Sequence, residues 1–260
     1  MTETAGAQTA PRRSHLIVVQ HHDRVPLGAL APALTLDADV TFVRGYRAPA
    51  EARAQVRALI DSGGYDGMVV LGGPMGVYEA ERFPFLLDSL SLLEDALRRG
   101  APILGLCLGS QLLSHALGSP VFPGSDRGLP PEVGYFPARL TGEGVADPAA
   151  TLYAEPDPVL FWHRDTHDLP DGAVLLATSD RYPLAAFRWG RWTYGFQFHL
   201  EITMEWLPRW IEESPLAEEA EGGAQELLRA GGRCAAVNSE RATALGRQFV
   251  EHARAFREGL

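Results

Sequence analysis

The chain has 260 residues, 46% of them hydrophobic and 22% charged, which is typical of a globular protein with a sizeable core. Its formal net charge is −10, and an acidic surface repels phosphate backbones, which disfavours nucleic-acid binding. Two cysteines are too few for a secreted disulfide framework, so we expect a cytoplasmic protein. No apolar run approaches the roughly 20 residues that a membrane helix needs, so we expect no membrane association.

The first half of the chain alternates short apolar segments with amphipathic ones. Residues 1–13 are small and polar and are predicted to be a disordered tail. The predicted strands that follow are 16–19, 40–43, 67–71 and 102–106. The predicted helices are 49–62 and 85–99, each followed by glycine. Buried strands that alternate with helices indicate an α/β fold, a doubly wound and mostly parallel sheet covered on both faces.

The second half has a different pattern. Its strand-like segments are closely spaced, which predicts antiparallel additions to the sheet, and they are 132–140, 173–178, 183–189 and 192–198. Residues 214–260 are expected to be a helical C-terminal extension, with an exposed acidic stretch at 214–232 and a closing helix at 238–257. Since neither a repeat nor a linker is present, we predict one domain over 14–260.

The most informative segment, Gly105–Gln111, follows the predicted strand 102–106 and reads GLCLGSQ. A helix is expected after it, at 111–117, so the cysteine lies in the strand–turn–helix context of a nucleophile elbow. The tight turn requires small flanking residues, which the two glycines supply. The helix N-terminus beneath the turn favours a thiolate. We interpret Cys107 as a nucleophile and the backbone N–H of Leu108 as an oxyanion donor.

A thiol nucleophile needs a base within reach, and the base needs an orienting group. His199 ends the predicted strand 192–198, and Glu201 follows two residues later. The period-2 geometry of an extended chain sends both side chains to one side, so the carboxylate can hold the far nitrogen of the imidazole. A lone His-x-Glu is more often a surface coincidence, but this position at a strand end favours a catalytic pair.

Three further features are ambiguous on their own. The predicted strand 67–71 ends in Gly72-Gly73-Pro74, which is either an ordinary tight turn or a second oxyanion donor beside the elbow. The segment His163–His167 contains three candidate metal ligands, but no further cluster completes a site, so we expect neither metal nor cofactor. Cys234 lacks the context of an elbow and is interpreted as structural.

Five segments, in order along the chain, resemble the class I glutamine amidotransferases, in particular the stand-alone proteins similar to the glutaminase domain of GMP synthase. The segments are Leu71–Met75, Gly105–Gln111, Glu132–Pro137, Trp162–Asp165 and Gly195–Glu201. The likeness covers roughly residues 15–210, and the elbow and the sequence GFQFHLE are its specific signals. The resemblance implies a flavodoxin-like class I glutamine amidotransferase fold.

Position by position, the resemblance implies a catalytic triad of Cys107, His199 and Glu201. It also implies oxyanion donors at Gly73 and Leu108. The triad chemistry is attack of the thiolate on a side-chain amide carbon, formation of a γ-glutamyl thioester, release of ammonia and hydrolysis.

The resemblance further implies a substrate-binding set, Gln111, His163, Arg164 and Asp165. The family commonly has glycine where this chain has Arg164. Its side chain either turns to solvent or lines the pocket mouth, where it can pair with a carboxylate of a longer substrate, and we favour the second. Leu200 replaces a common proline between His199 and Glu201, which the site tolerates.

Two activities fit these residues. The first is glutamine hydrolysis that passes ammonia to an unknown acceptor on a separate synthetase protein. The second uses the same triad on γ-glutamyl peptides or amines. Because Arg164 stands where the family commonly has glycine, the sequence does not clearly favour one activity over the other. A third hypothesis, a catalytically silent binding or regulatory relative, is disfavoured by the intact Cys-His-Glu set.

Overall fold

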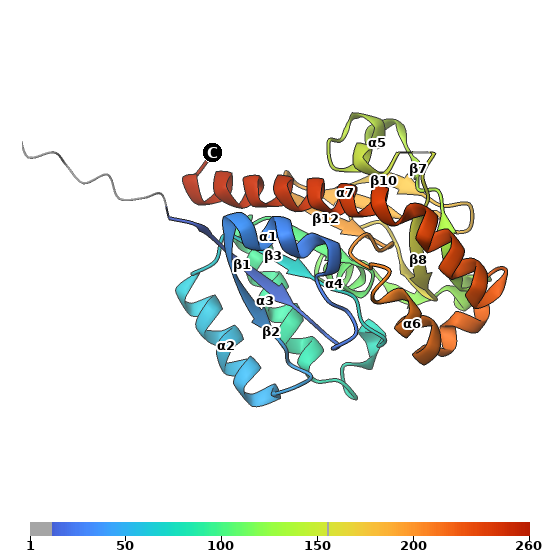
Figure 1. The fold of residues 1–260 in the computed structure, drawn as a ribbon. Helices are drawn as coiled ribbons and strands as arrows, with labels where there is room; N and C mark the ends of the chain where they lie inside the picture. The colour runs from blue at the N-terminus through green and yellow to red at the C-terminus, as the bar shows by residue number, and fades with distance from the viewer. Residues whose placement is uncertain (1–11, 155) are drawn as a thin grey trace, which may run out of the picture.

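The computed structural model describes residues 12–154 and 156–260, and within them the main sheet has eight strands in the order β2-β1-β3-β4-β12-β11-β10-β7 (Figure 1). The strands are β1 (Ser14–Val19), β2 (Ala38–Val43), β3 (Gly67–Val70), β4 (Ile103–Leu106), β7 (Arg139–Leu140), β10 (Ala173–Thr178), β11 (Ala186–Trp189) and β12 (Thr193–Phe196). The pairings from β2 to β12 are parallel, and those from β12 to β7 are antiparallel. The predicted mostly parallel sheet with antiparallel additions is therefore confirmed.

Two small antiparallel sheets lie outside the main one. They pair β5 (Val121–Pro123) with β9 (Asp165–His167), and β6 (Glu132–Phe136) with β8 (Val159–His163). The segment predicted as a strand at 132–140 is thus split between two sheets. Pro137, which has no backbone N–H to donate, stands in the break between β6 and β7.

The helices cover both faces of the main sheet. They are α1 (Ala31–Asp37), α2 (Pro49–Ser62), α3 (Phe85–Arg99), α4 (Leu108–Ala116), α5 (Gly142–Ala146), α6 (Leu207–Glu213) and α7 (Gly223–Glu258). Short 3-10 helices are η1 (Gly28–Leu30), η2 (Val77–Glu79), η3 (Gly124–Arg127), η4 (Ala150–Tyr153) and η5 (Pro215–Glu219). None of the described helices is long and apolar enough to cross a bilayer.

Alternating residues of β1 divide the core into two halves. Leu16 and Val18 pack into the cluster that contains the buried side chains of α1 and α7. Ile17 and Val19 point the other way, into the cluster formed with α2, α3 and α4. This period-2 division is the reason that β1 reads as a continuous apolar run in the sequence. Figure 1 shows α7 running beside α1 along one face of the sheet.

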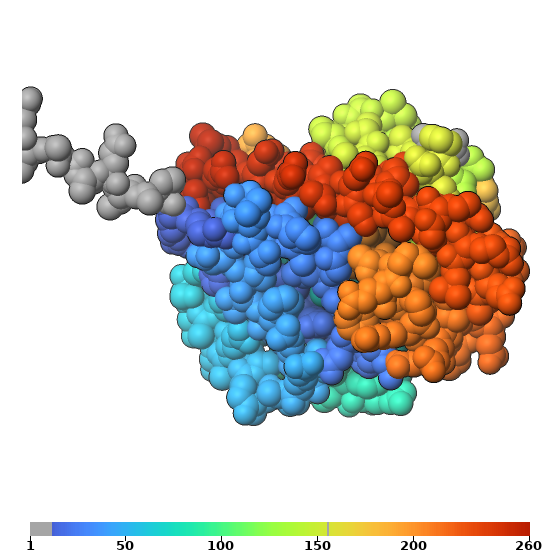
Figure 2. All heavy atoms as spheres, viewed as in Figure 1, coloured from blue at the N-terminus to red at the C-terminus, as the bar shows by residue number. Residues whose placement is uncertain are grey.

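The C-terminal segment is helical, but its last helix begins earlier than the predicted 238–257. It starts at Gly223, within the stretch 214–232, and continues for 36 residues. Glu218, Glu219 and Glu221 of that stretch are exposed, whereas Leu216 and Leu227 are buried. A Cβ at Gly231 would lie 2.5 Å from a methyl of Leu207, so this glycine permits close packing of α7 on α6 and does not mark a loop. In the space-filling view, the orange α6 region packs between the N-terminal half and the start of α7 (Figure 2).

Most of the predicted tail, residues 1–11 of 1–13, lies outside the described residues. Arg13, at its end, is held in place, because its guanidinium donates hydrogen bonds of 2.8 Å to the carbonyls of Thr35 and Ala38. These bonds join the start of β1 to the end of α1.

Candidate active site

Three parallel strands end side by side at one edge of the main sheet. Val70 of β3 pairs with Gly105 of β4, and Phe196 of β12 pairs with Leu106 of β4. The residues that follow each strand are therefore brought to the same carboxyl edge, where open α/β sheets bind ligands. The three chain segments that carry the predicted oxyanion, nucleophile and base residues meet at this edge.

The turn after β4 is strained. Cys107 has φ 51° and ψ −108°, and it is the one non-glycine residue with positive φ in the described part of the chain. The turn is held on both sides. The N–H of Cys107 donates to the carbonyl of Phe196 at 2.8 Å, and the carbonyl of Cys107 accepts from the N–H of Gln111 at 3.1 Å. Strain of this kind persists only where the surroundings impose it, and it clusters at functional sites.

The flanking glycines are required by close backbone contacts. A Cβ at Gly109 would lie 2.0 Å from the carbonyl oxygen of Val70, and one at Gly105 would lie 2.6 Å from the carbonyl oxygen of Gly109. Helix α4 begins at Leu108, three residues earlier than the predicted 111–117, so the cysteine sits directly at its N-terminus. Helix and thiol are therefore closer than the sequence pattern indicated.

His199 and Glu201 form a buried pair. The distance between Nδ1 of His199 and Oε1 of Glu201 is 2.6 Å, and both side chains are almost inaccessible to solvent. The backbone N–H of His199 donates to Leu160 of β8 at 2.7 Å, and the edge of its ring meets Trp210 at 4.9 Å between centroids. The ring is thus held by Glu201 and Trp210, and the backbone of His199 is held by β8.

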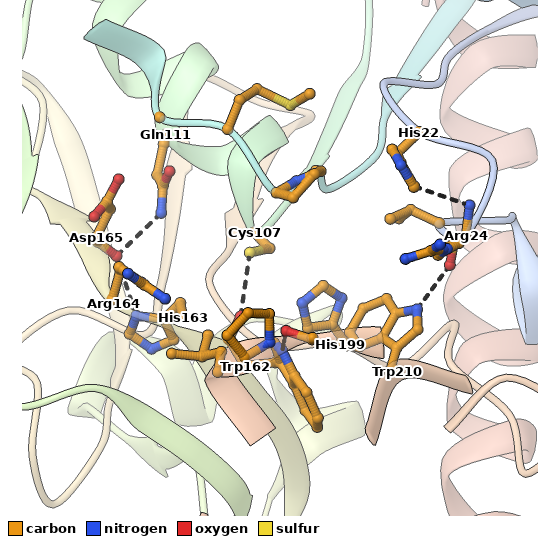
Figure 3. A pocket seen from close by; sticks show the side chains of 18 of the residues that line it. His22, Arg24, Cys107, Gln111, Trp162, His163, Arg164, Asp165, His199 and Trp210 are labelled. Carbon is orange, nitrogen blue, oxygen red and sulfur yellow. Dashed lines mark hydrogen bonds between the residues drawn. The ribbon is translucent and has the colours of Figure 1, made fainter. Parts of the chain in front are cut away.

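Cys107 and His199 lie against the same glycine. A Cβ at Gly72 would be 3.3 Å from Cε1 of His199 and 3.6 Å from Cβ of Cys107. Nε2 of His199 is buried without a hydrogen-bond partner among the described residues, so this nitrogen remains available for a reacting group. Both side chains line one cavity (Figure 3).

The electrostatic environment favours a protonated His199. Burial alone lowers its pKa, but the attraction of the Glu201 carboxylate and of Cys107 outweighs burial and raises the pKa to about 10. An imidazolium beside Cys107 is the ionic state that a thiolate nucleophile needs.

The two predicted oxyanion donors are neighbours. A Cβ at Gly73 would lie 2.8 Å from a methyl of Leu108, which shows how closely the two turns approach. Neither backbone N–H donates a hydrogen bond to an acceptor in residues 12–154 or 156–260. Two unpaired amides beside a cysteine are the geometry expected of an oxyanion hole.

The cavity has a volume of about 590 Å³, and its two ends differ. At one end Nε2 of Gln111 donates to the carbonyl of Asp165 at 3.1 Å, and the Asp165 carboxylate accepts from Tyr78 at 2.9 Å through Oδ2. Its Oδ1 is buried without a partner in the described chain, and burial raises the pKa of Asp165. At the other end lie His199, Trp210, Arg24 and His22 (Figure 3).

Arg164 is exposed and lines the cavity at the Gln111 end (Figure 3). Its guanidinium makes no hydrogen bond or ion pair with the described residues, although its charge lowers the pKa of Asp165 against the effect of burial. The end of the cavity that holds Gln111 and Asp165 therefore also carries an unpaired cation.

His163, predicted to bind substrate, uses both ring nitrogens within the protein. Nε2 lies 3.0 Å from the carboxylate of Glu132, and Nδ1 lies 3.1 Å from the carbonyl of Asp165. Glu132 in turn accepts from Ser179 at 2.7 Å. The side chain thus positions the strand that leads to Arg164 and Asp165 and has no nitrogen left for a ligand.

The candidate metal ligands of His163–His167 separate in space. His167 lies 3.2 Å from Ser110 Oγ and 3.0 Å from the carbonyl of Asp168, away from the partners of His163. No three His, Cys, Asp or Glu residues of the described chain are grouped to hold a metal ion.

Many lining residues are absent from the set predicted from the sequence, among them Arg24, Tyr78, Trp162 and Trp210. None of these four belongs to a segment with a recognisable local pattern except Trp162, which stands in one of the segments that carry the resemblance. Trp210 reaches the cavity because its indole N–H donates to the carbonyl of Arg24 at 2.7 Å, across 186 residues of chain. Contacts of this range leave no trace in local sequence.

Comparison with known proteins agrees with this geometry. The family model of glutamine amidotransferase class-I matches residues 32–213. The chain belongs to this family. Its matched segment includes Cys107, His199 and Glu201, and members of the family are in general cysteine-dependent glutamine amidohydrolases. The prediction made from sequence resemblance is therefore confirmed at the level of the family.

Several class I amidotransferase relatives are similar over part of the chain. The glutamine amidotransferase-like protein YfeJ of Salmonella typhimurium is 34% identical over 154 residues, covering 58% of this chain and 62% of that protein. A glutamine-hydrolysing GMP synthase of Streptococcus thermophilus is 36% identical over 141 residues, covering 52% of this chain and 24% of that protein. The chain thus aligns with less than two thirds of either relative's length.

Solved structures extend the likeness to the whole fold. A glutamine amidotransferase from Thermotoga maritima superposes with a TM-score of 0.77 and 27% identity, covering 92% of this chain and 99% of that one. A glutamine amidotransferase from Methylobacillus flagellatus gives 0.75 at 24% identity, covering 92% and 95%.

Proposed function

We propose that this class I amidotransferase hydrolyses the γ-amide of glutamine through a triad of Cys107, His199 and Glu201. The observation that carries the proposal is the meeting of three adjacent strand ends, which brings Gly73, Cys107 and His199 into one cavity. A strained cysteine, a buried His–Glu pair and two unpaired amides in one place are what acyl transfer requires.

In the first half of the reaction, the thiolate of Cys107 attacks the amide carbon of the substrate side chain. The carbonyl electrons move to oxygen, and the N–H groups of Gly73 and Leu108 stabilise that oxyanion. When the carbonyl re-forms, the carbon–nitrogen bond breaks, and Nε2 of His199 gives its proton to the leaving nitrogen. Ammonia departs and a γ-glutamyl thioester remains on Cys107.

In the second half, water takes the place of ammonia. His199, now neutral, accepts a proton from water as the oxygen attacks the thioester carbon. The carbon–sulfur bond breaks, glutamate leaves and the thiolate is restored beside an imidazolium. Glu201 holds the imidazole by Nδ1 through both halves, so that Nε2 always faces the reacting atoms.

The amino-acid end of the substrate fits the polar end of the cavity. The unpaired Oδ1 of Asp165 suits an α-ammonium group, and the unpaired guanidinium of Arg164 suits an α-carboxylate. Gln111 holds the carbonyl of Asp165 and lines the space for the glutamyl stem. His163 contributes indirectly, by fixing this segment against Glu132.

The proposed product, ammonia, needs an acceptor. GMP synthases among the relatives are named as glutamine-hydrolysing, and the likeness to them covers 24% of the Streptococcus thermophilus protein. We infer that a synthetase uses the ammonia released by this chain.

A second candidate function is hydrolysis of γ-glutamyl peptides or amines by the same triad. The volume of about 590 Å³ favours it, because cavities of roughly 300–1,000 Å³ take drug-sized ligands, which are larger than glutamine.

The test is glutamate release from glutamine and from a panel of γ-glutamyl compounds, together with labelling by an electrophilic glutamine analogue. We expect release from at least one γ-glutamyl amide and an adduct on Cys107. Cys234 is the internal control, because burial raises the pKa of its thiol and it lies outside the cavity. No release from any compound, or a main adduct on Cys234, contradicts the proposal.

A further inference from the structure

The leaving group of an amide has a defined direction in this site. His199 protonates the leaving nitrogen in the proposed function, on which this inference rests. Any substituent on that nitrogen must therefore extend past Nε2 of His199, away from the end that holds Gln111 and Asp165. Figure 3 shows what lies there, with Trp210, Arg24 and His22 beyond His199.

The cavity wall at the Trp210 end is apolar. Trp162 and Trp210 pack edge to face at 5.5 Å, and both are more than nine-tenths buried. Both indole N–H groups are already used, Trp210 with the carbonyl of Arg24 at 2.7 Å and Trp162 with Ser214 at 3.4 Å. The indole surfaces left for a ligand are therefore apolar. Leu216 and Val25, also buried, are further apolar residues that line the cavity.

The charged groups at this end are paired, and the imidazolium of His199 has the carboxylate of Glu201 as its partner. Arg24 forms an ion pair with Glu213, so neither presents an unmatched charge to a ligand. Burial lowers the pKa of His22, which keeps its ring neutral near pH 7. This end thus differs from the opposite one, where Asp165 Oδ1 and the Arg164 guanidinium have no partner among the described residues.

Part of this wall lies beyond the segment that defines the family. The family match ends at residue 213, whereas Ser214, Pro215 and Leu216 all line the cavity. The 3-10 helix η5 carries the last two, and Leu216 is buried against the hydrophobic core. The cavity is therefore built in part by residues outside the matched segment.

We propose that this end of the cavity is a leaving-group subsite for an uncharged, apolar or aromatic amine, so that the preferred substrates are γ-glutamyl amides of such amines. The reaction is the one described above with a substituted nitrogen. The carbon–nitrogen bond breaks, the proton of His199 goes to that nitrogen, and a primary amine leaves in place of ammonia. Water then completes the hydrolysis, so atoms and charges balance without any co-reactant.

The first experiment compares three substrates of the wild-type chain: glutamine, γ-glutamylbenzylamide and γ-glutamylglycine. We expect kcat/KM for the benzylamide to exceed that for glutamine at least about tenfold, since even one well-packed methylene is worth that much. γ-Glutamylglycine places a carboxylate in the neutral, apolar end and is expected to stay well below the benzylamide. A benzylamide no better than glutamine, or a glycine compound that exceeds it, overturns the subsite.

The second experiment changes the wall. Leu216→Ser is expected to lower the ratio of kcat/KM for benzylamide to that for glutamine about fivefold to tenfold. Leu87→Ser, at an exposed leucine of α3 outside the cavity, is the matched control and keeps the wild-type ratio. If Leu216→Ser leaves the ratio unchanged, the wall is assigned wrongly.

A binding measurement on a different variant tests the subsite even if Leu216→Ser does not fold. Calorimetry on Cys107→Ala should show tighter binding of γ-glutamylbenzylamide than of glutamine, and equal or weaker binding overturns the subsite. Failure of the proposed function looks different, because then the wild type releases glutamate from none of the three compounds.

Discussion

The parallel and antiparallel parts of this molecule contribute to the cavity by different means. The parallel strands β3, β4 and β12 end side by side and bring backbone amides, a cysteine and a histidine to one edge. The part around β8, β9 and α6 supplies side chains that form the walls, among them Asp165, Trp162 and Trp210. Groups proposed to react therefore depend on backbone register, while groups proposed to select substrate depend on side-chain packing.

The two parts therefore differ in how well they tolerate amino-acid substitution. Around the elbow, atoms of the backbone would meet a new Cβ at 2.0 Å at Gly109 and 2.6 Å at Gly105, so the sequence has almost no freedom. Arg164 and Arg24 stand at exposed positions of the cavity rim and can change without moving the backbone. Mutations in the two parts should separate catalysis from specificity.

The largest effect is expected for Cys107→Ala. It removes the proposed nucleophile without adding bulk, so glutamate release should fall by about 10⁴-fold or more while the fold remains. Glutamate assays with circular dichroism measure both. Cys234→Ala, the control at the other buried cysteine, should keep activity within about twofold. If Cys107→Ala still released glutamate at a near-wild-type rate, Cys107 would not be the nucleophile, and the contrast between reacting and substrate-selecting residues would fail.

His199→Ala should reduce kcat more than Glu201→Gln. The histidine moves the proton, whereas the carboxylate orients and stabilises the ring. In serine triads the orienting group alone is worth about 10⁴-fold, so the order of the two losses is the prediction. Single-turnover rates of both variants measure it, and equal or reversed losses would mean that the roles are assigned wrongly.

Gly109→Ala should displace the elbow. The new Cβ overlaps the carbonyl of Val70, so we expect a cost of about 1–3 kcal/mol in the free energy of unfolding and a loss of activity of about 10²-fold. Gly142→Ala in α5 is the matched control, because its Cβ would meet nothing within 4 Å. Denaturant unfolding and kcat/KM distinguish them. Similar effects in both variants would show that the elbow is not specially constrained.

Glu201→Gln should also move the alkaline limb of the pH profile. In the wild type, attraction by Glu201 helps to raise the pKa of His199 to about 10, so the imidazolium persists through neutral pH and is lost as pH rises through that value. Without the carboxylate charge the pKa falls, and kcat/KM should decline at a pH at least about one unit lower. An unmoved limb would assign that limb to another group.

The smallest effect is expected at Arg164. If its guanidinium pairs with a substrate carboxylate at an exposed site, Arg164→Met should raise KM for glutamine about threefold to tenfold with kcat retained. Arg24→Met is the control, because Arg24 is already paired with Glu213 and should change KM for glutamine less. Equal KM changes in the two variants would remove the contrast between the two ends of the cavity.

Local sequence determined a large share of the fold and of the candidate site. The helices at 49–62 and 85–99 have the predicted bounds, because apolar periodicity and a glycine at each C-terminus are local signals. The elbow around Cys107 and the pair of His199 and Glu201 could also be predicted from the sequence, since each depends on a few consecutive residues.

Tertiary structure alone decided which groups face the cavity. Strand β12 pairs with β4 although about 90 residues separate them, and that pairing brings His199 beside Cys107. Likewise, His163 faces Glu132 across β6 and β8, and that strand pairing decides the partner of its Nε2 atom. At Gly231 in α7, the absence of a side chain allows Leu207 of α6 to approach closely, which the sequence did not indicate. Such pairings depend on surfaces that form only when distant segments meet, so no local pattern encodes them.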